Sequence, residues 1–316
     1  MSFLDKLPKP FFILAPMDDV TDSVFRQIIA DCAPPDMYFT EFVNVDGLQS
    51  PGRKKLLPKL KFSQDERPIM AQIWGLNPDN FYKTTRELVA MGFDGVDINM
   101  GCPVKTVIKN GACAALINNR DLAGEIIDAV REGAGKDFPV SLKTRVGFTT
   151  PDLSWPEFLL SKKLDLLSIH ARTAKQKSQV PANWNLVGEI CQLRDRLCPA
   201  TKIVGNGDVM SRQQGLKLAE KYKLDGVMIG RGVFNDPFIF AEQSPWSGWP
   251  KSDKLALYKK HVELFDQTWQ NKERRVETLN KFCKIYINGF DGAKDLREQL
   301  MAAKSTKGLL TLLSAA

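Results

Sequence analysis

The fold is decided by KIVGNGD at 202–208 and GVMIGRG at 226–232, because each stretch is a short apolar run that ends in closely spaced glycines. Glycine lets backbone N–H groups approach an anion, and a following helix N-terminus adds a favourable dipole. In (β/α)8 barrels a phosphate group often binds in the loops after strands seven and eight. The pair therefore predicts a phosphate site, and the alternative is two ordinary tight turns.

Six similar apolar runs precede these two stretches, and segments long enough for a helix separate them. Together the runs predict eight strands, at 11–14, 37–40, 69–73, 95–98, 140–142, 166–169, 202–204 and 226–229. Helices are predicted between them, for example at 21–30, 79–91, 121–133, 184–193 and 212–222. Eight such units predict an α/β fold, the closed (β/α)8 TIM barrel, and an open doubly wound sheet is the alternative.

Polar residues, glycines or, after the first strand, a Pro-Met pair follow the predicted strands. In chain order they are Pro16 and Met17, Glu41, Gln72, Asn99, Lys143 and Arg145, His170 and Arg172, Asn206 and Gly207, and Gly230 and Arg231. A barrel enzyme has its active site at the C-terminal ends of its strands. The pattern therefore predicts one active-site rim built from all eight strands.

Composition predicts a globular protein with more than one domain. The chain has 316 residues, 43% of them hydrophobic, which is enough for one large domain and a small one. We expect a barrel domain at 1–245 and a helical-bundle domain at 246–316. The six cysteines are dispersed without C-x2-C spacing, so free thiols and no metal site are expected. No apolar run reaches the roughly 18 residues of a membrane helix, and we expect a cytoplasmic monomer without an obligate protein partner.

The basic charge suggests a polyanionic partner. The net charge is +7, and the residues after 250 contain 13 Lys or Arg against 8 Asp or Glu, so most of the excess lies in this tail. Solvated basic residues are the alternative. The candidate phosphate contacts are Arg53, Lys54, Lys55, Lys59 and Lys61, and, in the tail, Lys259, Lys260, Lys272, Arg274, Arg275, Lys281 and Lys284.

The segment NMGCPVK at 99–105 resembles the active-site signature of the tRNA-dihydrouridine synthases, flavoenzymes that use FMN. Further motifs resemble the family in the same order: Ala15–Met17, Thr40–Glu41, Ala71–Ile73, Gly111–Leu116, Lys143–Gly147, Ile169–Thr173, Gly205–Asp208 and Ile229–Gly232. The resemblance covers residues 11 to about 240, and the basic tail from Lys254 is similar to the family's helical RNA-binding domain.

The resemblance implies reduction of the C5–C6 double bond of a uridine in tRNA. Reduced FMN would deliver a hydride to C6 while Cys102 protonates C5, and an ordinary thiol pKa of about 8.5 would keep Cys102 mostly protonated at neutral pH. NADPH, or else NADH, would reduce the flavin by transient stacking, because no G-x-G-x-x-G follows a strand. The target nucleotide must leave its stack to react. Cys113 is interpreted as a buried structural cysteine.

The resemblance also assigns roles to the strand ends. The expected FMN-binding residues are Pro16, Met17, Asp18, Gln72, Lys143, His170, Asn206, Gly207, Asp208, Gly230 and Arg231. The expected substrate-binding residues are Asn99, Arg145, Lys105 and Arg172. Two other functions stay open: a flavin barrel that reduces a free pyrimidine or small enone, and an RNA-binding protein without catalysis.

Overall fold

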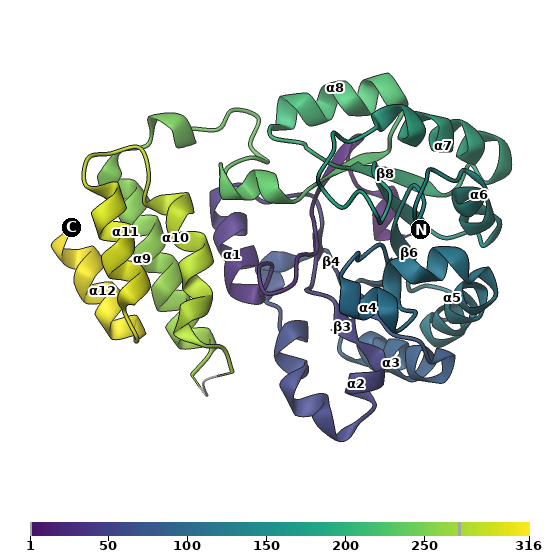
Figure 1. The fold of residues 1–316 in the computed structure, drawn as a ribbon, viewed down its shortest axis with the longest axis horizontal. Coiled ribbons are helices and arrows are strands. Elements are labelled where there is room, and N and C mark those ends of the chain that lie inside the picture. Colours follow the sequence, from purple (N-terminus) through teal and green to yellow (C-terminus); the bar gives the residue numbers. More distant parts are fainter. Residues whose placement is uncertain (1, 271–272) are drawn as a thin grey trace.

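A barrel of parallel strands forms the larger part of the molecule (Figure 1). The computed structural model describes residues 2–270 and 273–316. Its strands are β1 (Phe11–Leu14), β2 (Tyr38–Phe39), β3 (Val43–Asn44), β4 (Ile69–Trp74), β5 (Gly95–Met100), β6 (Val140–Arg145), β7 (Leu166–His170), β8 (Lys202–Asn206) and β9 (Gly226–Ile229). They pair in parallel in the order β1-β9-β8-β7-β6-β5-β4-β2, and β3 also pairs with β4.

The sheet closes on itself between β1 and the segment before β2. A parallel bridge joins Ile13 to Met37, and the amide of Leu14 donates to the carbonyl of Met37 at 3.4 Å. The predicted barrel is therefore confirmed, and the open doubly wound sheet is excluded. The second barrel strand differs from its prediction, because it is split into β2 and β3, which pair with different parts of β4.

Helices surround the strands. The barrel carries α1 (Ser23–Cys32), α2 (Val45–Leu48), α3 (Pro78–Ala90), α4 (Lys105–Lys109), α5 (Arg120–Ala134), α6 (Ser154–Ser161), α7 (Trp184–Leu197) and α8 (Arg212–Tyr222). Side-chain caps start several of them, for example Asp22, whose carboxylate accepts from the amide of Phe25 at 2.9 Å at the start of α1. Each helix predicted between strands is present, within a few residues of its predicted limits.

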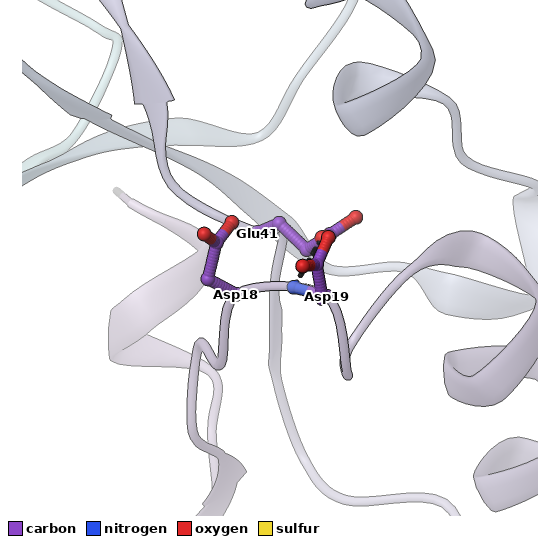
Figure 2. Close-up of side chains that lie close together, drawn as sticks. All are labelled: Asp18, Asp19 and Glu41. Atoms are coloured by element: carbon purple, nitrogen blue, oxygen red, sulfur yellow. Dashed lines mark hydrogen bonds between the residues drawn. The ribbon is translucent and has the colours of Figure 1, made fainter. Parts of the chain in front are cut away.

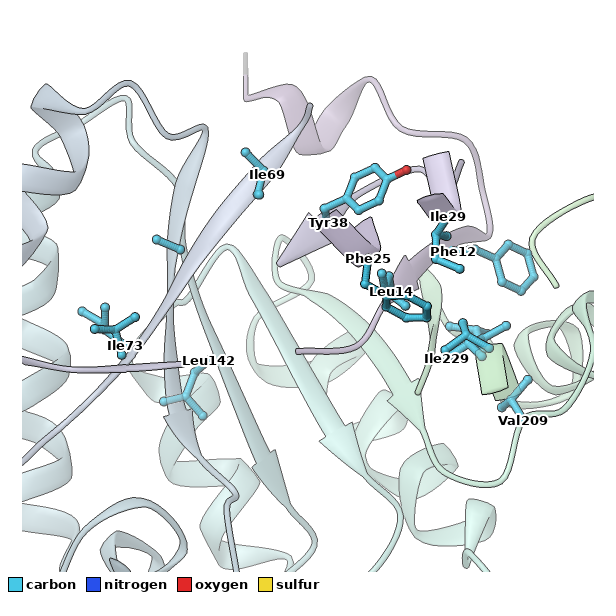
Figure 3. Packing of buried hydrophobic residues seen from close by; sticks show 14 of the residues in the cluster. Phe12, Leu14, Phe25, Ile29, Tyr38, Ile69, Ile73, Leu142, Val209 and Ile229 are labelled. Carbon is cyan, nitrogen blue, oxygen red and sulfur yellow. The ribbon is translucent and has the colours of Figure 1, made fainter. Parts of the chain in front are cut away.

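Alternation along the strands separates two hydrophobic clusters. Phe11 and Ile13 belong to an inner cluster, together with residues from β4, β7, β8 and β9, and strands this far apart meet only inside the barrel. Phe12 and Leu14 belong to the outer cluster, which packs against the helices (Figure 3). Successive side chains of a strand point to opposite faces, so one strand serves both clusters. Each fully buried Phe or Ile contributes about 1.5–3 kcal/mol.

The helices α9 (Lys251–Thr268), α10 (Asn280–Tyr286), α11 (Ala293–Ala302) and α12 (Thr306–Ala315) lie together at one end of the molecule, beside α1 (Figure 1). The ring of Phe25 in α1 stacks on Phe282 in α10 with ring centres 4.7 Å apart. This arrangement agrees with the expected C-terminal helical bundle, whereas the division at residue 245 stays a prediction. No helix of the described residues is long and apolar enough to span a bilayer.

Candidate active site at the strand ends

A pocket of about 190 Å³ lies at the C-terminal ends of β1, β6, β7, β8 and β9. The predicted site residues that line the pocket are Pro16, Met17, Lys143, His170, Arg172, Asn206, Gly207, Asp208, Gly230 and Arg231. Arg172, which we expected on the substrate side, thus lies in the same wall as the expected FMN residues.

Strand alternation explains why polar groups collect here. Lys143, His170 and Asn206 stand two residues along the strand from inward-facing Ser141, Ser168 and Val204, so they point into the barrel at its C-terminal rim. The intervening Leu142 and Ile169 pack outward against the helices. The interior is therefore apolar at its base and polar at its rim.

At Gly207 the backbone itself forms the wall of the pocket, because glycine has no side chain. Its φ of +136° lies in the region that favours glycine, and a Cβ atom there would be 2.9 Å from the Cβ of Ala182 and 3.6 Å from a ring carbon of His170. The neighbouring Asn206 donates from Nδ2 to the carbonyl of Met228 at 2.9 Å and so joins the C-terminal ends of β8 and β9. The two glycine-containing loops therefore lie side by side in the pocket wall, and the phosphate site at them stays a prediction.

Asp208 holds two arginines at the pocket wall. Its carboxylate forms ion pairs with Arg172 and, at 3.0 Å, with Arg231, and it accepts from the amide of Ala182 at 3.1 Å. An ionised carboxylate has no hydrogen to donate to a phosphate. Asp208 thus orients Arg172 and Arg231 at the pocket wall, and its direct contact with the cofactor stays a prediction.

His170 is neutral in this site. Nη1 of Arg172 lies 3.2 Å from Nε2 of the imidazole, and since a guanidinium only donates, Nε2 is the acceptor and the proton resides on Nδ1. Burial and the positive charges of Arg145, Lys143 and Arg172 hold the pKa of His170 well below its usual value. The ring therefore contributes an N–H donor rather than a positive charge.

The ammonium group of Lys143 loses its proton, and with it its positive charge, more easily than an ordinary lysine does. Burial lowers the pKa of Lys143 to about 8, and the nearby Arg145 lowers it further, while Asp97 opposes the shift. Lys143 is the direct strand partner of Asn99. The lysine and the Cys102 loop, which follows Asn99, therefore come from adjacent strands at one rim.

A buried chain of hydrogen bonds leads from the barrel interior to Cys102. Asp97 accepts from Nε2 of Gln72 at 2.7 Å, and Oε1 of Gln72 accepts from Nδ2 of Asn99 at 3.0 Å. Oδ1 of Asn99 then accepts from the amides of Gly101 and Cys102 at 3.1 and 3.0 Å. Gln72, which we expected at the flavin, is fully buried beneath the pocket and fixes Asn99.

Cys102 is half-buried in the loop after β5, and its pKa is lowered to about 7. The neighbouring thiol of Cys113 is the largest cause, and the amide of Val104 and the charge of Arg145 act in the same direction against burial. This pKa is lower than the ordinary thiol value on which our expectation of a mostly protonated Cys102 rested. A pKa near the working pH suits a general acid.

Arg145 and Lys105 occupy different positions around this loop. Arg145 is buried and donates to the carbonyls of Gly101 at 2.7 Å and of Thr173 and Lys177 at 3.0 Å, so it ties the loops after β5 and β7 together. Lys105 is exposed at the start of α4 and does not line the pocket. The structure brings Arg145, but not Lys105, into the buried site.

An acidic cluster of Asp18, Asp19 and Glu41 lies on the loops after β1 and β2, and one carboxylate oxygen of each residue lies within 4.8 Å of those of the other two (Figure 2). Basic side chains balance the cluster: Lys59 pairs with Asp18, and Arg274 pairs with Glu41. Asp18 is exposed and does not line the pocket, contrary to the FMN contact that we expected.

Several predicted phosphate contacts are engaged within the protein. Lys59 and Arg274 bind the acidic cluster, Lys61 donates to the carbonyl of Thr268 at 2.9 Å, and Lys281 donates to that of Asp19 at 2.7 Å. Arg53 pairs with Glu87 and Lys260 with Asp31, each at 2.7 Å. Lys272 lies outside the described residues. Within residues 2–270 and 273–316, the exposed candidates without an ion-pair partner are Lys54, Lys55, Lys259, Arg275 and Lys284.

Two residues of this site were missed by the sequence interpretation. Asp97 could have been found, because it stands two residues before Asn99 in a strand and so shares its inward face. Cys113 gave no such signal, because its contact with Cys102 depends on how the segment after α4 folds back. Asp97 is fully buried, which raises its pKa to about 6.

Comparison with known proteins gives the family. The sequence model of the Dihydrouridine synthase (Dus) family matches residues 13–316. The chain is 45% identical over 307 residues to "Probable tRNA-dihydrouridine synthase" of Staphylococcus aureus (strain COL), covering 96% of this chain and 92% of the relative. It is also 45% identical over 316 residues to "Probable tRNA-dihydrouridine synthase 2" of Bacillus subtilis (strain 168), covering 99% and 95%.

Solved structures share the barrel fold. Histamine dehydrogenase from Rhizobium sp. 4-9 aligns with a TM-score of 0.58 and 14% identity over 80% of this chain, which spans only 48% of that protein. Morphinone reductase in complex with tetrahydroNAD aligns with a TM-score of 0.51 and 14% identity, covering 76% of this chain and 89% of the other. Because identity is this low, these structures support the fold, and the family rests on the sequence matches. The chain belongs to the dihydrouridine synthase family of oxidoreductases.

Proposed function

We propose that this chain reduces the C5–C6 double bond of a uridine in tRNA, with FMN in the pocket and NADPH or NADH as the electron source. The observation that carries the proposal is the convergence of Cys102 and Lys143 on one rim, beside a glycine-lined, basic pocket. The names of the S. aureus and B. subtilis relatives support tRNA as the substrate.

The donors around the pocket fit FMN. Arg172, Arg231 and the backbone at Gly207 suit a phosphate group, because they combine positive charge with close N–H access. Lys143 and the N–H of His170 suit the polar edge of a flavin ring, where a positive charge stabilises the reduced form. Pro16, Met17, Asn206 and Gly230 complete the wall. When bound and reduced, FMN supplies the hydride for C6.

Cys102 gives the proton to C5. Its S–H bond breaks as the new C–H bond forms, and the electron pair stays on sulfur beside Arg145 and the amide of Val104. Asn99 fixes this loop through its Oδ1 atom. We assign the uracil oxygens to the second Nδ2 hydrogen of Asn99 and to Nη2 of Arg145, the donors of these side chains that bond nothing within the described residues. Lys105 would contact the RNA outside the pocket.

The target uridine must be turned out of the RNA stack, which costs a few kcal/mol. Attraction between phosphates and exposed cations offsets this cost. Lys54 and Lys55 on the barrel, and Lys259, Arg275 and Lys284 near the helical domain, are exposed and so available for it. We therefore place the RNA across both parts of the molecule.

The test uses the purified full chain. We expect a yellow flavin spectrum and, with NADPH, formation of dihydrouridine in unmodified tRNA but not from free uracil. Cys102→Ala should keep the spectrum and lose the product, whereas Cys32→Ala, a change in a half-buried thiol of α1, should leave both unchanged. Efficient reduction of free uracil would instead favour a small-molecule flavin reductase, and absence of bound flavin would contradict the proposal.

A further inference from the structure

We propose that Asp97 is a positioning residue: its buried carboxylate fixes which way the side-chain amides of Gln72 and Asn99 face. Through these two amides it holds the loop of the proton donor Cys102 in place. The inference rests on the proposed function for the reaction itself. The hydrogen bonds are a feature of the protein alone, so they can be tested without turnover.

The direction of each hydrogen bond between Asp97 and the Cys102 loop is fixed from the two ends of the chain. At one end the ionised carboxylate of Asp97 only accepts, and it bonds Nε2 of Gln72 at 2.7 Å. At the other end the backbone amides of Gly101 and Cys102 only donate, and they bond Oδ1 of Asn99 at 3.1 and 3.0 Å. Between the ends, Nδ2 of Asn99 donates to Oε1 of Gln72 at 3.0 Å. Reversing either side-chain amide would therefore bring two acceptors or two donors together.

Strand alternation places these side chains in the barrel interior. Asp97 and Asn99 stand two residues apart in β5 and share its inward face, and Gln72 is the strand partner of Asp97 in β4. Asp97 and Gln72 are completely buried, and Asn99 is only 6% exposed. At such depth the loss of one partner leaves a polar group unsatisfied, which costs more than the hydrogen bond itself contributes. The chain is therefore stable only as a whole.

The carboxylate of Asp97 is anchored independently of the loop. The hydroxyl of Ser141 in β6 donates to Oδ1 of Asp97, whereas Gln72 bonds Oδ2. The charged group that faces Asp97 is Lys143, also from β6, and its positive charge favours the ionised carboxylate. Burial raises the pKa of Asp97 to about 6, so the group is still mostly ionised at neutral pH. A charged acceptor forms a hydrogen bond roughly twice as strong as a neutral one, so the ionised carboxylate holds Gln72 firmly.

The arrangement matters for the reaction because Asn99 has two tasks. Its Oδ1 atom holds the loop of Cys102, and its second Nδ2 hydrogen is the donor that we assign to the uracil. One side chain thus places both the proton donor and the substrate, and small displacements of reacting groups reduce a rate strongly. Asp97 acts on both through Gln72 and Asn99 without touching the substrate.

The alternative is that Asp97 only satisfies polar groups of the core and has no influence on the loop. Asp97→Leu and Gln72→Met each interrupt the chain with an apolar side chain of similar size. Ser141→Ala is the matched control, because it removes the other hydrogen bond of the same carboxylate and leaves the chain to Asn99 intact.

The readout is hydrogen exchange at the backbone amides of Gly101 and Cys102 in the full chain. Labelling at about pH 7.5 keeps Asp97 ionised, and fragmentation mass spectrometry resolves the single amides. The amide of Ile203 in β8, which donates to Asp225 at 2.9 Å, reports any general loss of stability. A change confined to the loop amides therefore separates positioning from a merely structural role.

In Asp97→Leu both loop amides should exchange about two- to tenfold faster, the factor that corresponds to one ordinary hydrogen bond. Gln72→Met should have the same effect, and the double variant should show no more than either change alone, because both interrupt one chain. Ser141→Ala should leave both loop amides unchanged, whatever it does to Ile203. The kcat for tRNA reduction by Asp97→Leu should fall by a similar factor, with KM unchanged.

A second pair of variants tests the direction of the hydrogen bonds. Asp97→Asn keeps a neutral acceptor and should speed exchange of the loop amides less than Asp97→Leu does. Adding Gln72→Glu moves the carboxylate one side chain along, where it accepts from the amides on both sides. This double variant should restore the exchange rates of the unaltered protein.

Unchanged exchange at the loop amides of folded Asp97→Leu, or additive effects of Asp97→Leu and Gln72→Met, would overturn the proposal. If Asp97→Leu does not fold, the decision passes to Asp97→Asn, and a failure of Gln72→Glu to restore its loop protection overturns the proposal as well. Faster loop exchange in the variants of a protein that forms no dihydrouridine would support the hydrogen-bond chain and contradict the proposed function, so the two failures are distinguishable.

Discussion

Arg274 forms an ion pair with Glu41 across the boundary between the helical domain and the barrel. Glu41 follows β2 and is completely buried, and the guanidinium of Arg274 is only 8% exposed. Arg274 also lies 3.4 Å from Asp22 and stacks on the ring of Trp269 at 5.1 Å. The residue that we predicted to bind RNA phosphate is therefore part of the contact that joins the two domains.

Arg274→Ala should destabilise the protein by about 3–5 kcal/mol, because it leaves buried carboxylates without their main partner. Lys59, whose Nζ lies 4.0 Å from Glu41, favours the lower end of this range. Urea unfolding measures the loss, and Arg275→Ala, at the exposed neighbouring arginine, should change stability by less than about 0.5 kcal/mol. Adding Glu41→Gln to Arg274→Ala should recover part of the loss, and a fully additive double variant would contradict the pairing.

The loss in Arg274→Ala should depend on pH. Burial raises the pKa of both Glu41 and Asp22, so the folded state binds their protons more tightly than the unfolded state does. The charge of Arg274 opposes this rise, so its loss raises both folded pKa values further. The variant therefore gains more stability than the unaltered protein as the pH falls through these folded pKa values, and it loses that gain as the pH rises. The stability deficit of the variant should shrink between pH 8 and pH 5, and a deficit independent of pH would exclude this explanation.

Reduction of uridine should slow as the pH rises above about 7. Cys102 gives up a proton and must therefore be protonated, and its pKa is about 7. Lys143 should add a second loss above about pH 8, where its positive charge disappears. Single-turnover rates of pre-reduced enzyme with tRNA measure the profile. His170 is neutral throughout, so we expect no change in the rate near pH 6.5. In Cys102→Ser the decrease in rate near pH 7 should disappear, because a hydroxyl group does not titrate there.

Gly207→Ala should weaken FMN binding at least tenfold while the chain still folds. The added Cβ meets Ala182 at 2.9 Å with a backbone φ of +136°, so the loop must shift where the phosphate is expected. Quenching of FMN fluorescence during titration of the apoprotein gives the affinity. Gly248→Ala is the control, since a Cβ there meets nothing within 4 Å. Unaltered FMN affinity in Gly207→Ala would place the phosphate elsewhere.

Binding of tRNA should weaken with salt while FMN stays bound. Each phosphate contact contributes a slope of roughly 0.7–0.9 in a plot of log affinity against log salt. Replacing exposed Lys54 and Lys55 by Ala should therefore reduce the slope by about one to two. Lys162→Ala, which removes a lysine paired with Asp128 at 2.8 Å on the barrel's outer face, should not change it. A flat salt dependence in the unaltered protein would exclude this RNA surface.

Local patterns in the sequence predicted the barrel and most of its pocket. The sequence has eight apolar runs, and the residues that follow them include His170, Asn206 and Gly230. These residues meet at the pocket because the parallel strands of one barrel end at one rim. A strand's side chains alternate between two faces, so position along the strand also determines which residues point inward. These features depend on neighbours in the chain, and the sequence contains them directly.

The tertiary structure alone decided which charges are engaged and what surrounds Cys102. Nothing near Asp208, Lys59 or Arg274 in the sequence indicates a partner for their charges. In the structure each of them pairs with an oppositely charged side chain, 36, 41 and 233 residues away respectively. The contact of Cys113 with Cys102 likewise depends on a turn between them. The pKa of an ionisable group depends on the groups within a few ångströms of it, and only the folded chain brings those groups together.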